Sequence, residues 1–266
     1  MIHTDTMQTK TFNTYSVIDL NIVETTLATA MAEVSRMAKQ GVGGYACFVN
    51  AHVSVMAKHD RALKKAVNEA SFAFPDGMPV YLVGRYLLGK NNHKISGPDF
   101  MQQMFENKDL RKLNHYFYGG TKEVIELLVS ELKQKYPDCN IVGAESPPFR
   151  ALSEDEELQA LTRMINAEAQ LIWVGLGAPK QELWMQKNTG KLKKSVLLGV
   201  GAAFDFHSGS LERAPVIMQK IGLEWLYRFL QEPGRLWKRY LVTNSLFLFY
   251  IFIDTIKRLF MKGSSE

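Results

Sequence analysis

Short runs of apolar residues alternate along most of this chain with longer stretches that carry apolar residues at helical spacing. The short runs predict buried strands at 45–49, 114–118, 140–144, 171–174 and 195–201. The longer stretches predict helices at 19–40, 53–70, 122–136, 153–169 and 180–187. Because this alternation is typical of parallel sheets covered by helices, we predict an α/β fold, a Rossmann-like three-layer structure with a mostly parallel sheet.

Such sheets bind ligands beyond the carboxyl ends of their strands, where this chain places glycine and polar residues. These are Asn50, Asp76, Gly119–Gly120, Gly175–Gly177 and Gly199–Gly201. Asp76 stands between Pro75, which keeps the preceding residue extended, and Gly77, which permits a sharp turn. That setting is typical of a catalytic carboxylate at a strand end, and it fits equally an aspartate that caps a helix over 78–88.

The glycine turns complete none of the common nucleotide-binding motifs. Neither Gly175–Pro179 nor Gly199–Phe204 gives G-x-G-x-x-G, and neither is followed about 20 positions later by an acidic residue on a clear ribose-binding strand. The chain also lacks G-x-x-x-x-G-K-[ST]. A nicotinamide-dependent oxidoreductase is therefore disfavoured, and a P-loop nucleotidase is excluded.

Composition and charge indicate a folded protein with a basic end. The 266 residues are 46% hydrophobic and 22% charged, with a net charge of +5. Residues 213–262 hold nine basic and three acidic side chains, a net of +6, so the rest of the chain is about neutral. We therefore divide the chain into a Rossmann-like catalytic domain (1–210) and a basic, aromatic helical appendage (211–266), which needs an anionic partner.

Localisation is indicated by the cysteines and by the first residues. Cys47 and Cys139 have no metal-ligand spacing and cannot form a disulfide framework, which suits a reducing cytosol. Residues 1–20 contain no apolar stretch behind a basic start, so they do not resemble a secretory signal. We expect a cytoplasmic protein.

The tail of the chain has the character of a helix that lies in a membrane interface. Its unbroken apolar part, 246–253, is eight residues long, whereas a spanning helix needs roughly 20. Aromatic and aliphatic residues here are flanked by Trp237, Arg239 and Lys257. We expect peripheral association with an anionic membrane surface. The alternative is a C-terminal helix docked on the protein core or in an oligomer interface.

Six separated blocks together resemble the WecG/TagA/CpsF family of bacterial glycosyltransferases. They are Asn50, FPDGMPV (74–80), ISGPDFM (95–101), VGLGAPKQE (174–182), GVGAAFDF (199–206), and RAP (213–215) with GLEWLYR (222–228). The resemblance implies an inverting, metal-independent transfer of a sugar from a UDP donor to a sugar linked to undecaprenyl diphosphate. Typical members transfer N-acetylmannosamine, or its uronic acid, to N-acetylglucosamine in the synthesis of teichoic acid or related polysaccharides.

The resemblance also implies roles for polar residues. Asp76 would be the base that takes the proton from the acceptor hydroxyl. Asp205 is its rival, and we favour substrate binding for it. Asn50 and Gln181 would contact sugar hydroxyls or the uracil, with Gly177 in the same substrate-binding turn, although Gln181 could also be an ordinary polar residue in the first turn of a helix.

The departing UDP needs positive charge, and the chain has no Asp-x-Asp motif to hold a metal. The resemblance assigns catalytic roles to Arg228 and Arg235 and substrate contacts to Lys238 and Arg239, because arginine binds two phosphate oxygens at once. Many members carry arginine where this chain has Lys94, which can bind phosphate only as a point charge. Some of these cations could instead contact lipid headgroups.

A competing hypothesis is a non-catalytic module that binds a nucleotide sugar or another polyanion. Nucleic acid is not an expected partner, because the chain carries no RNA-binding aromatic motif and no helix-turn-helix signature. Homo-oligomerisation remains possible, and no cofactor is expected.

Overall fold

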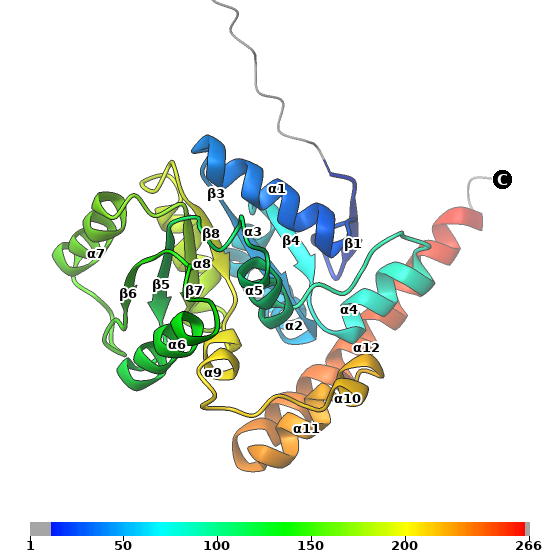
Figure 1. The fold of residues 1–266 in the computed structure, drawn as a ribbon. Helices are drawn as coiled ribbons and strands as arrows, with labels where there is room; N and C mark the ends of the chain where they lie inside the picture. The colour runs from blue at the N-terminus through cyan, green and yellow to red at the C-terminus, as the bar shows by residue number, and fades with distance from the viewer. Residues whose placement is uncertain (1–11, 264–266) are drawn as a thin grey trace, which may run out of the picture.

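The computed structural model describes residues 12–263 and has a six-stranded parallel sheet at its centre (Figure 1). The strand order is β4–β3–β8–β7–β5–β6. The strands are β3 (Gly44–Val49), β4 (Phe72–Pro75), β5 (His115–Gly119), β6 (Ile141–Glu145), β7 (Leu171–Gly175) and β8 (Val196–Gly199). Helices cover both faces, so the predicted α/β, Rossmann-like three-layer architecture is confirmed.

Two hydrophobic layers hold the helices on the sheet. One layer packs α1 (Leu27–Gln40), α5 (Gly97–Glu106), α6 (Lys122–Lys135) and α9 (Ala203–His207) on one face. The other packs α2 (Ala51–His59), α3 (Arg61–Asn68), α7 (Glu154–Asn166) and α8 (Lys180–Asn188) on the opposite face. Strands buried on both faces read as continuous apolar runs, which is why the sequence pattern identified them.

The strand register brings the strand ends to one edge of the sheet. Val49 of β3 pairs with Pro75 of β4, and Gly119 of β5 pairs with Gly175 of β7. Gly199 of β8 pairs with both neighbouring strands. The residues that follow these strands therefore share a single edge, as a parallel sheet requires.

Three predicted helices differ from the structure. The predicted helix over 19–40 is wrong at its start, because β1 (Thr14–Val17) and β2 (Leu20–Val23) form an antiparallel hairpin there. Its turn places Ile18 and Asp19 at φ of 50° and 62°, a conformation that aspartate tolerates. The helix over 53–70 is split into α2 and α3 by Asp60, which caps α3. Residues 78–88 form α4 (Met78–Leu82) and then a π-helix, η1 (Val83–Leu87).

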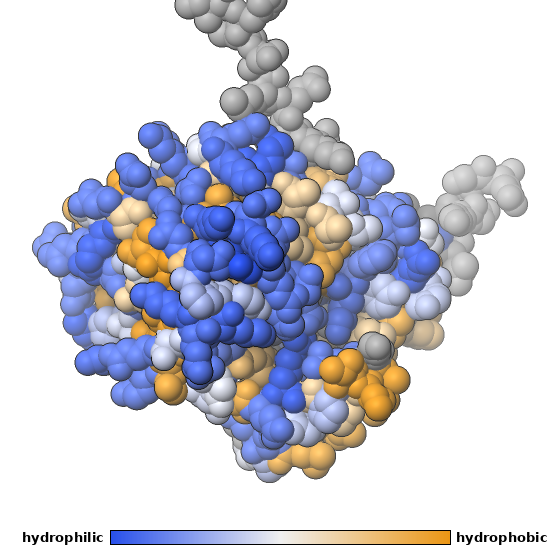
Figure 2. Space-filling view, in the orientation of Figure 1, coloured by the Kyte–Doolittle hydropathy of each residue, from blue (hydrophilic) through white to orange (hydrophobic). Residues whose placement is uncertain are grey.

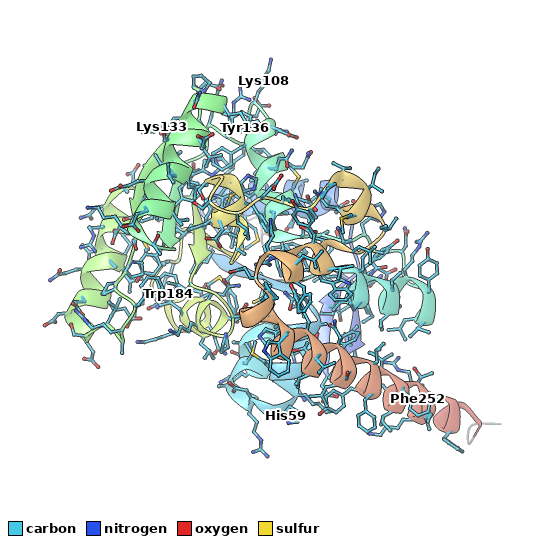
Figure 3. All side chains as sticks on the ribbon, turned by 90° about the horizontal axis from the view of Figure 1, so that it is seen from below. His59, Lys108, Lys133, Tyr136, Trp184 and Phe252 are labelled. Atoms are coloured by element: carbon cyan, nitrogen blue, oxygen red, sulfur yellow. The ribbon has the colours of Figure 1, made fainter. Side chains whose placement is uncertain are left out.

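The basic C-terminal appendage is helical, as predicted, and comprises α10 (Val216–Lys220), α11 (Glu224–Gln231) and α12 (Pro233–Gly263). One face of α12 docks on α2, with Leu236 and Phe247 buried. His52 contacts Thr243 at 3.2 Å, and His59 contacts the Tyr250 hydroxyl at 2.8 Å. Figure 3 shows α12 running past His59, with Phe252 further along the helix.

The other face of α12 is exposed and apolar. Only 11% of the stretch Tyr240–Arg258 is buried, and by length and composition alone this stretch could cross a membrane. The unbroken apolar run at 246–253, which is eight residues long, did not indicate a stretch of this length. The docked face fits the alternative of a C-terminal helix packed on the protein core, and the exposed face fits the alternative of a helix in a membrane interface.

Replacing Gly119 tests how tightly the sheet edge is packed. A Cβ atom there would lie 2.5 Å from the carbonyl carbon of Gly175, and Gly119 has a φ of 129°. We expect Gly119→Ala to lower the free energy of unfolding by about 2 kcal/mol or more. The matched control is Gly190→Ala, because a Cβ atom at Gly190 would meet nothing within 4 Å. Denaturant unfolding of both variants measures the difference, and equal stabilities would contradict the packing described.

Candidate active site

Asp76 directly follows β4 and is held there by backbone hydrogen bonds. Its N–H donates to the Val49 carbonyl oxygen at 2.9 Å, and the adjacent Pro75 carbonyl accepts from Ile95. The cap position of α4 is occupied by Gly77, which has a φ of 80° and makes no side-chain cap hydrogen bond. The interpretation of Asp76 as a helix cap is therefore wrong. Its carboxyl group is half-buried at the end of the strand.

The surroundings of Asp76 bring the pKa of its carboxyl group close to neutral pH. Burial raises the pKa of its carboxyl group from 3.8 to about 7, and the negative charges of Glu224 and Asp99 act in the same direction. The positive charge of Lys94 and a hydrogen bond from Asn50 oppose the rise. A carboxylate with such a pKa can accept a proton and is partly ionised under physiological conditions.

Asn50 connects two strand ends through its side chain. It is the N-cap of α2, where its Oδ1 accepts from the Val53 N–H at 3.1 Å. Because the amide oxygen is used in this way, the amide NH₂ is the group that can donate to the Asp76 carboxyl. Asn50 therefore orients Asp76 and stabilises its ionised form.

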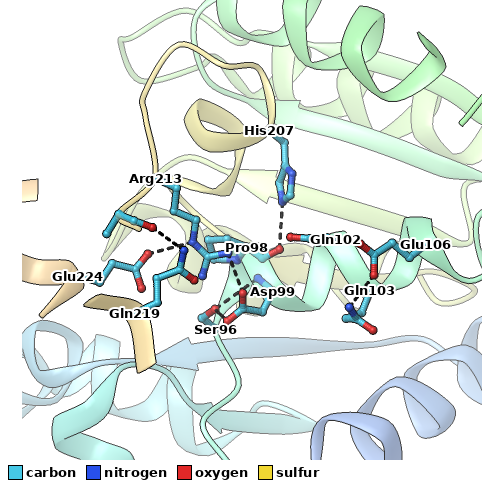
Figure 4. A network of polar contacts seen from close by, with 11 residues as sticks. Ser96, Pro98, Asp99, Gln102, Gln103, Glu106, His207, Arg213, Gln219 and Glu224 are labelled. Carbon is cyan, nitrogen blue, oxygen red and sulfur yellow. Dashed lines mark hydrogen bonds and ion pairs between the residues drawn. The ribbon is translucent and has the colours of Figure 1, made fainter. Parts of the chain in front are cut away.

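A network of charges joins the appendage to the start of α5 (Figure 4). The Arg213 guanidinium lies 2.7 Å from Asp99 Oδ1 and donates through Nε to Glu224 Oε1 at 3.0 Å. Ser96, the N-cap of α5, donates to the other Asp99 oxygen at 2.5 Å. Burial opposes ionisation of Asp99, yet its interactions with Arg213 hold its pKa below the ordinary value. We call Asp99, Arg213 and Glu224 the clasp.

Arg228 of α11 and Arg213 of the clasp lie near the same aromatic ring. The guanidinium carbons of Arg213 and Arg228 lie 6.0 Å and 5.3 Å from the centre of the Phe206 ring, so both cations stack near one aromatic side chain. Arg213 Nη2 and Arg228 Nε are buried and have no hydrogen-bond partner among the described residues. Each of these buried N–H groups can donate a hydrogen bond to an anionic oxygen.

Gln181 and its neighbours belong to the edge of the sheet beyond β7 and β8. Gln181 is 5% exposed, and its amide NH₂ donates to the Gly199 carbonyl oxygen at 2.8 Å and to Glu182. Its Oε1 has no hydrogen-bond partner among the described residues. Gly177, in the turn before α8, has a φ of 74° and open space where a side chain would begin. The NH₂ group of Gln181 thus supports the β8 end, and only its oxygen is left for a ligand.

The rival carboxylate, Asp205, lies in α9, just beyond β8, and is half-buried. His207, at the end of the same helix, donates from Nε2 to the Pro98 carbonyl oxygen at 3.0 Å, and burial lowers its pKa. His207 therefore ties α9 to the start of α5. Arg235, Lys238 and Arg239 belong to α12, but their side chains lie outside the described residues.

Three residues at the site did not appear among the residues assigned from the sequence: Asp99, Arg213 and Glu224. Each lies in a block that carried the family resemblance, which was the available signal. Among residues 12–263, no group of three or more His, Cys, Asp or Glu side chains is placed to hold a metal ion. A groove of about 800 Å³ between α1 and α5 is lined by no residue of this site and is therefore not part of it.

Comparison with known proteins identifies the family to which this chain belongs. The family model for "Glycosyl transferase WecG/TagA/CpsF family" matches residues 15–260. A Bacillus subtilis (strain 168) protein is 30% identical over 202 residues, covering 76% of this chain and 77% of the relative. One from Bacillus spizizenii (strain ATCC 23059 / NRRL B-14472 / W23) is 28% identical over 237 residues, covering 88% of each.

A third relative, from Staphylococcus aureus (strain MW2), is 30% identical over 214 residues, covering 80% of this chain and 81% of the relative. All three are named N-acetylglucosaminyldiphosphoundecaprenol N-acetyl-beta-D-mannosaminyltransferase. The family model spans nearly the whole described chain, including the sheet edge, the clasp and the appendage. This chain therefore belongs to the WecG/TagA/CpsF family and is a glycosyltransferase.

Proposed function

We propose that this enzyme moves an N-acetylmannosamine-type sugar from a UDP donor to N-acetylglucosamine linked to undecaprenyl diphosphate. The transfer inverts the anomeric centre, needs no metal and serves the synthesis of a cell-surface polysaccharide. The names of the three relatives support the transferred sugar and the acceptor. The observation that carries the proposal is the half-buried Asp76 at the end of β4, whose carboxyl group has a pKa of about 7 and is acted on by the Lys94 cation.

In the proposed reaction Asp76 accepts the proton of the acceptor hydroxyl as that oxygen bonds to the anomeric carbon of the donor. The bond between this carbon and the UDP oxygen breaks on the opposite face, and its electron pair leaves with UDP. Direct displacement on one carbon inverts its configuration. Asn50 keeps the carboxylate oriented, and the half-buried position leaves it accessible to the hydroxyl.

The departing diphosphate is stabilised by side-chain cations in this proposal. Arg228 has a buried Nε without a hydrogen-bond partner among the described residues, and Lys94 acts electrostatically on Asp76, so both are candidates to bind the diphosphate. Arg235, Lys238 and Arg239 follow in α12 and would add to this charge. Guanidinium groups suit the task because each can bind two phosphate oxygens.

Sugar and uracil contacts are assigned to the remaining polar residues at the sheet edge. The open space at Gly177 allows a ligand to approach the backbone, and Gln181 Oε1 can accept a hydrogen bond from it. Asp205 lies beyond the central β8 strand and would bind donor hydroxyl groups. In this assignment Asp205 binds and Asp76 takes the proton.

We further propose that the enzyme sits on the inner face of the cell membrane and contacts it through α12. The exposed apolar face of this helix and its basic residues support an interfacial position. A spanning orientation of Tyr240–Arg258 would carry the contacts with His52 and His59 of α2 into the bilayer. Peripheral association is therefore favoured over crossing.

Replacing Asp76 by asparagine removes the proton acceptor while keeping the shape of the side chain. We expect turnover to fall by about 10²- to 10⁴-fold with donor binding largely retained. Ionisation of a carboxyl group whose pKa is raised in the folded state destabilises that state. Above pH 7, Asp76→Asn should therefore raise the free energy of unfolding by roughly 1–4 kcal/mol. Single-turnover assays and denaturant unfolding measure the two effects. A loss of stability without loss of turnover would indicate a structural role, and Asp109→Asn, at an exposed position, is the control.

The pH dependence of kcat/KM tests the electrostatics of the same carboxyl group. The base works when ionised, so activity should rise as the pH increases through about 7. Glu224→Gln removes a negative charge that raises the pKa of Asp76, and it also frees the Arg213 cation, so the acidic limb should move to lower pH. The distant Glu126→Gln should leave the limb in place. A limb that stays fixed or moves to higher pH in Glu224→Gln would disprove this coupling.

Arg228 is tested by truncation and by a change of cation. We expect Arg228→Ala to lower kcat by about 10²-fold and Arg228→Lys to recover part of that loss, since lysine keeps the charge but loses the two-pronged contact. Arg150→Ala, at an exposed arginine paired with Glu156, serves as the matched control. Equal activity of Arg228→Ala and Arg150→Ala would remove Arg228 from the mechanism.

A further inference from the structure

Phe206 is an aromatic residue of α9 that lies outside the hydrophobic core. Phe204, two positions earlier, is 1% exposed and packs edge-on against Phe117, with 5.6 Å between the ring centres. Phe206 is half-buried, and among the described residues it belongs to neither hydrophobic layer of the sheet. Its ring lies instead near two guanidinium groups, those of Arg213 and Arg228. The ring therefore acts on cations rather than on apolar packing.

Apolar packing does not fix α11 against the sheet. None of the residues of this helix is buried. On the neighbouring α10, Val216 and Ile217 are 61% and 73% exposed, and Figure 2 shows hydrophobic residues at the surface around α10. Trp225 packs edge-on against Tyr240 of α12, so this aromatic contact holds α11 to the appendage and not to the sheet. Arg228 needs a different contact to hold its side chain near the strand ends.

The clasp and the Phe206 ring hold successive turns of α11. Glu224, in the first turn, pairs with Arg213. Arg228 lies four residues later on the same side of the helix, where its guanidinium carbon is 5.3 Å from the centre of the Phe206 ring. The negative face of the ring attracts both cations and offsets the repulsion between them. Phe206 thus connects the second turn of α11 to α9, which follows β8.

The two guanidinium groups differ in how their charge is compensated. Arg213 is paired with Asp99 and Glu224, whereas Arg228 makes no ion pair with the described residues. An aromatic face attracts a guanidinium group through its charge and leaves the N–H groups in its plane free to donate to oxygen atoms. The Nε of Arg228 has no hydrogen-bond partner among the described residues. The contact with Phe206 therefore leaves Arg228 able to bind a phosphate group.

The neighbours of Phe206 make its ring a fixed support. Phe204 anchors α9 in the core, and His207 binds the Pro98 carbonyl oxygen at 3.0 Å, beside Asp99 of the clasp. Asp205, between the two aromatic residues, is the side chain that the proposed function assigns to the donor sugar. A ring between two anchored residues keeps its position, as a residue that orients a cation must.

We propose that Phe206 is a positioning residue that holds the Arg228 guanidinium group where it meets the diphosphate as UDP departs. The inference rests on the proposed function, in which Arg228 stabilises the leaving group. Phe206 acts through Arg228 and needs no contact with the substrate. Because negative charge on the leaving oxygen grows as the bond breaks, a well-placed cation lowers the barrier more than it strengthens binding of the donor.

Substitutions at position 206 separate the aromatic face from the bulk of the side chain. Phe206→Leu and Phe206→Met remove the aromatic face and keep an apolar side chain, whereas Phe206→Tyr keeps the face. The matched control is Tyr136→Leu, because the Tyr136 ring also lies near two cations, with Lys135 Nζ at 5.3 Å and the Arg111 guanidinium carbon at 5.6 Å. The assays use the full-length protein with the UDP-sugar and the lipid-linked acceptor of the proposed function.

Phe206→Leu and Phe206→Met should each lower kcat by roughly 3- to 30-fold with little change in KM for the donor. Phe206→Tyr should keep most of the wild-type kcat, and Tyr136→Leu should keep all of it. A purely structural role predicts a lower unfolding temperature with an unchanged kcat per folded enzyme, and that result would overturn the proposal. Equal losses of kcat in Phe206→Leu and Phe206→Tyr would also overturn it, because the aromatic face would then not matter.

A double-mutant cycle shows whether Phe206 acts through Arg228. In an Arg228→Ala background, Phe206→Leu should lower kcat further by less than about twofold, because the cation that the ring positions is gone. A further loss as large as the one in the wild-type background would mean that Phe206 acts through Arg213 or another group, and the proposal would be wrong.

Binding of UDP and of uridine gives a second measurement that does not depend on turnover. Titration calorimetry should show that Phe206→Leu weakens UDP binding by a factor similar to its loss of kcat and leaves uridine binding unchanged, since Arg228 meets only the diphosphate. Unchanged UDP binding would count against the proposal. A wild-type protein that transfers sugar from no UDP-sugar would count against the proposed function, whereas an active wild type matched by Phe206→Leu would count against Phe206 alone.

Discussion

The ion bridge made by Arg213 is the interaction on which the site depends. It connects Asp99, at the start of α5, to Glu224, at the start of α11, and so fixes the appendage against the edge of the sheet. The bridge fixes the start of α11, which carries Arg228, and it acts together with the packing of α12 on α2. Removing one partner of such a bridge would leave a partly buried charge uncompensated, which is costly.

The bridge also explains how the site can be both charged and nearly neutral. Besides Asp205, these segments carry three carboxylates, Asp76, Asp99 and Glu224, and three cations, Lys94, Arg213 and Arg228. Two of the carboxylates pair with Arg213, whereas the pKa of Asp76 is raised chiefly by burial and then by the charges of Glu224 and Asp99, with Lys94 opposing the rise. A diphosphate added to this balance would need further positive charge, which the basic residues of α12 can supply. The charge of the appendage therefore complements a deficit in the catalytic core.

The sequence was sufficient for the repeating strands and helices because each carries its own periodicity. It failed at Ile18–Asp19, where a tight turn with two positive φ values interrupts a pattern that can be read as helical. At the site, Asp76 and Asn50 were identified by their places at strand ends and by the family resemblance. Asp99, Arg213 and Glu224 were not, since neither the Asp99–Arg213 pair, 114 positions apart, nor the Arg213–Glu224 pair, 11 positions apart, leaves a periodic trace. Nor could the local pattern decide whether Asp76 caps a helix, which depends on the backbone at Gly77.

The contacts of α12 with α2 have a consequence for how the enzyme can vary. His52 and His59 are seven residues apart, and so are their partners Thr243 and Tyr250, which means that the two helices run in parallel with matched phase. One residue inserted between 243 and 250 would rotate everything beyond it by about 100° and turn Phe252 towards a different direction. Changes of side chain along the outer face leave the register between α12 and α2 intact, whereas a change of length between positions 243 and 250 disturbs it. Contacts with α2 thus fix the rotation of α12 about its axis, and the spacing between Thr243 and Tyr250 is a stricter requirement than the composition of the helix.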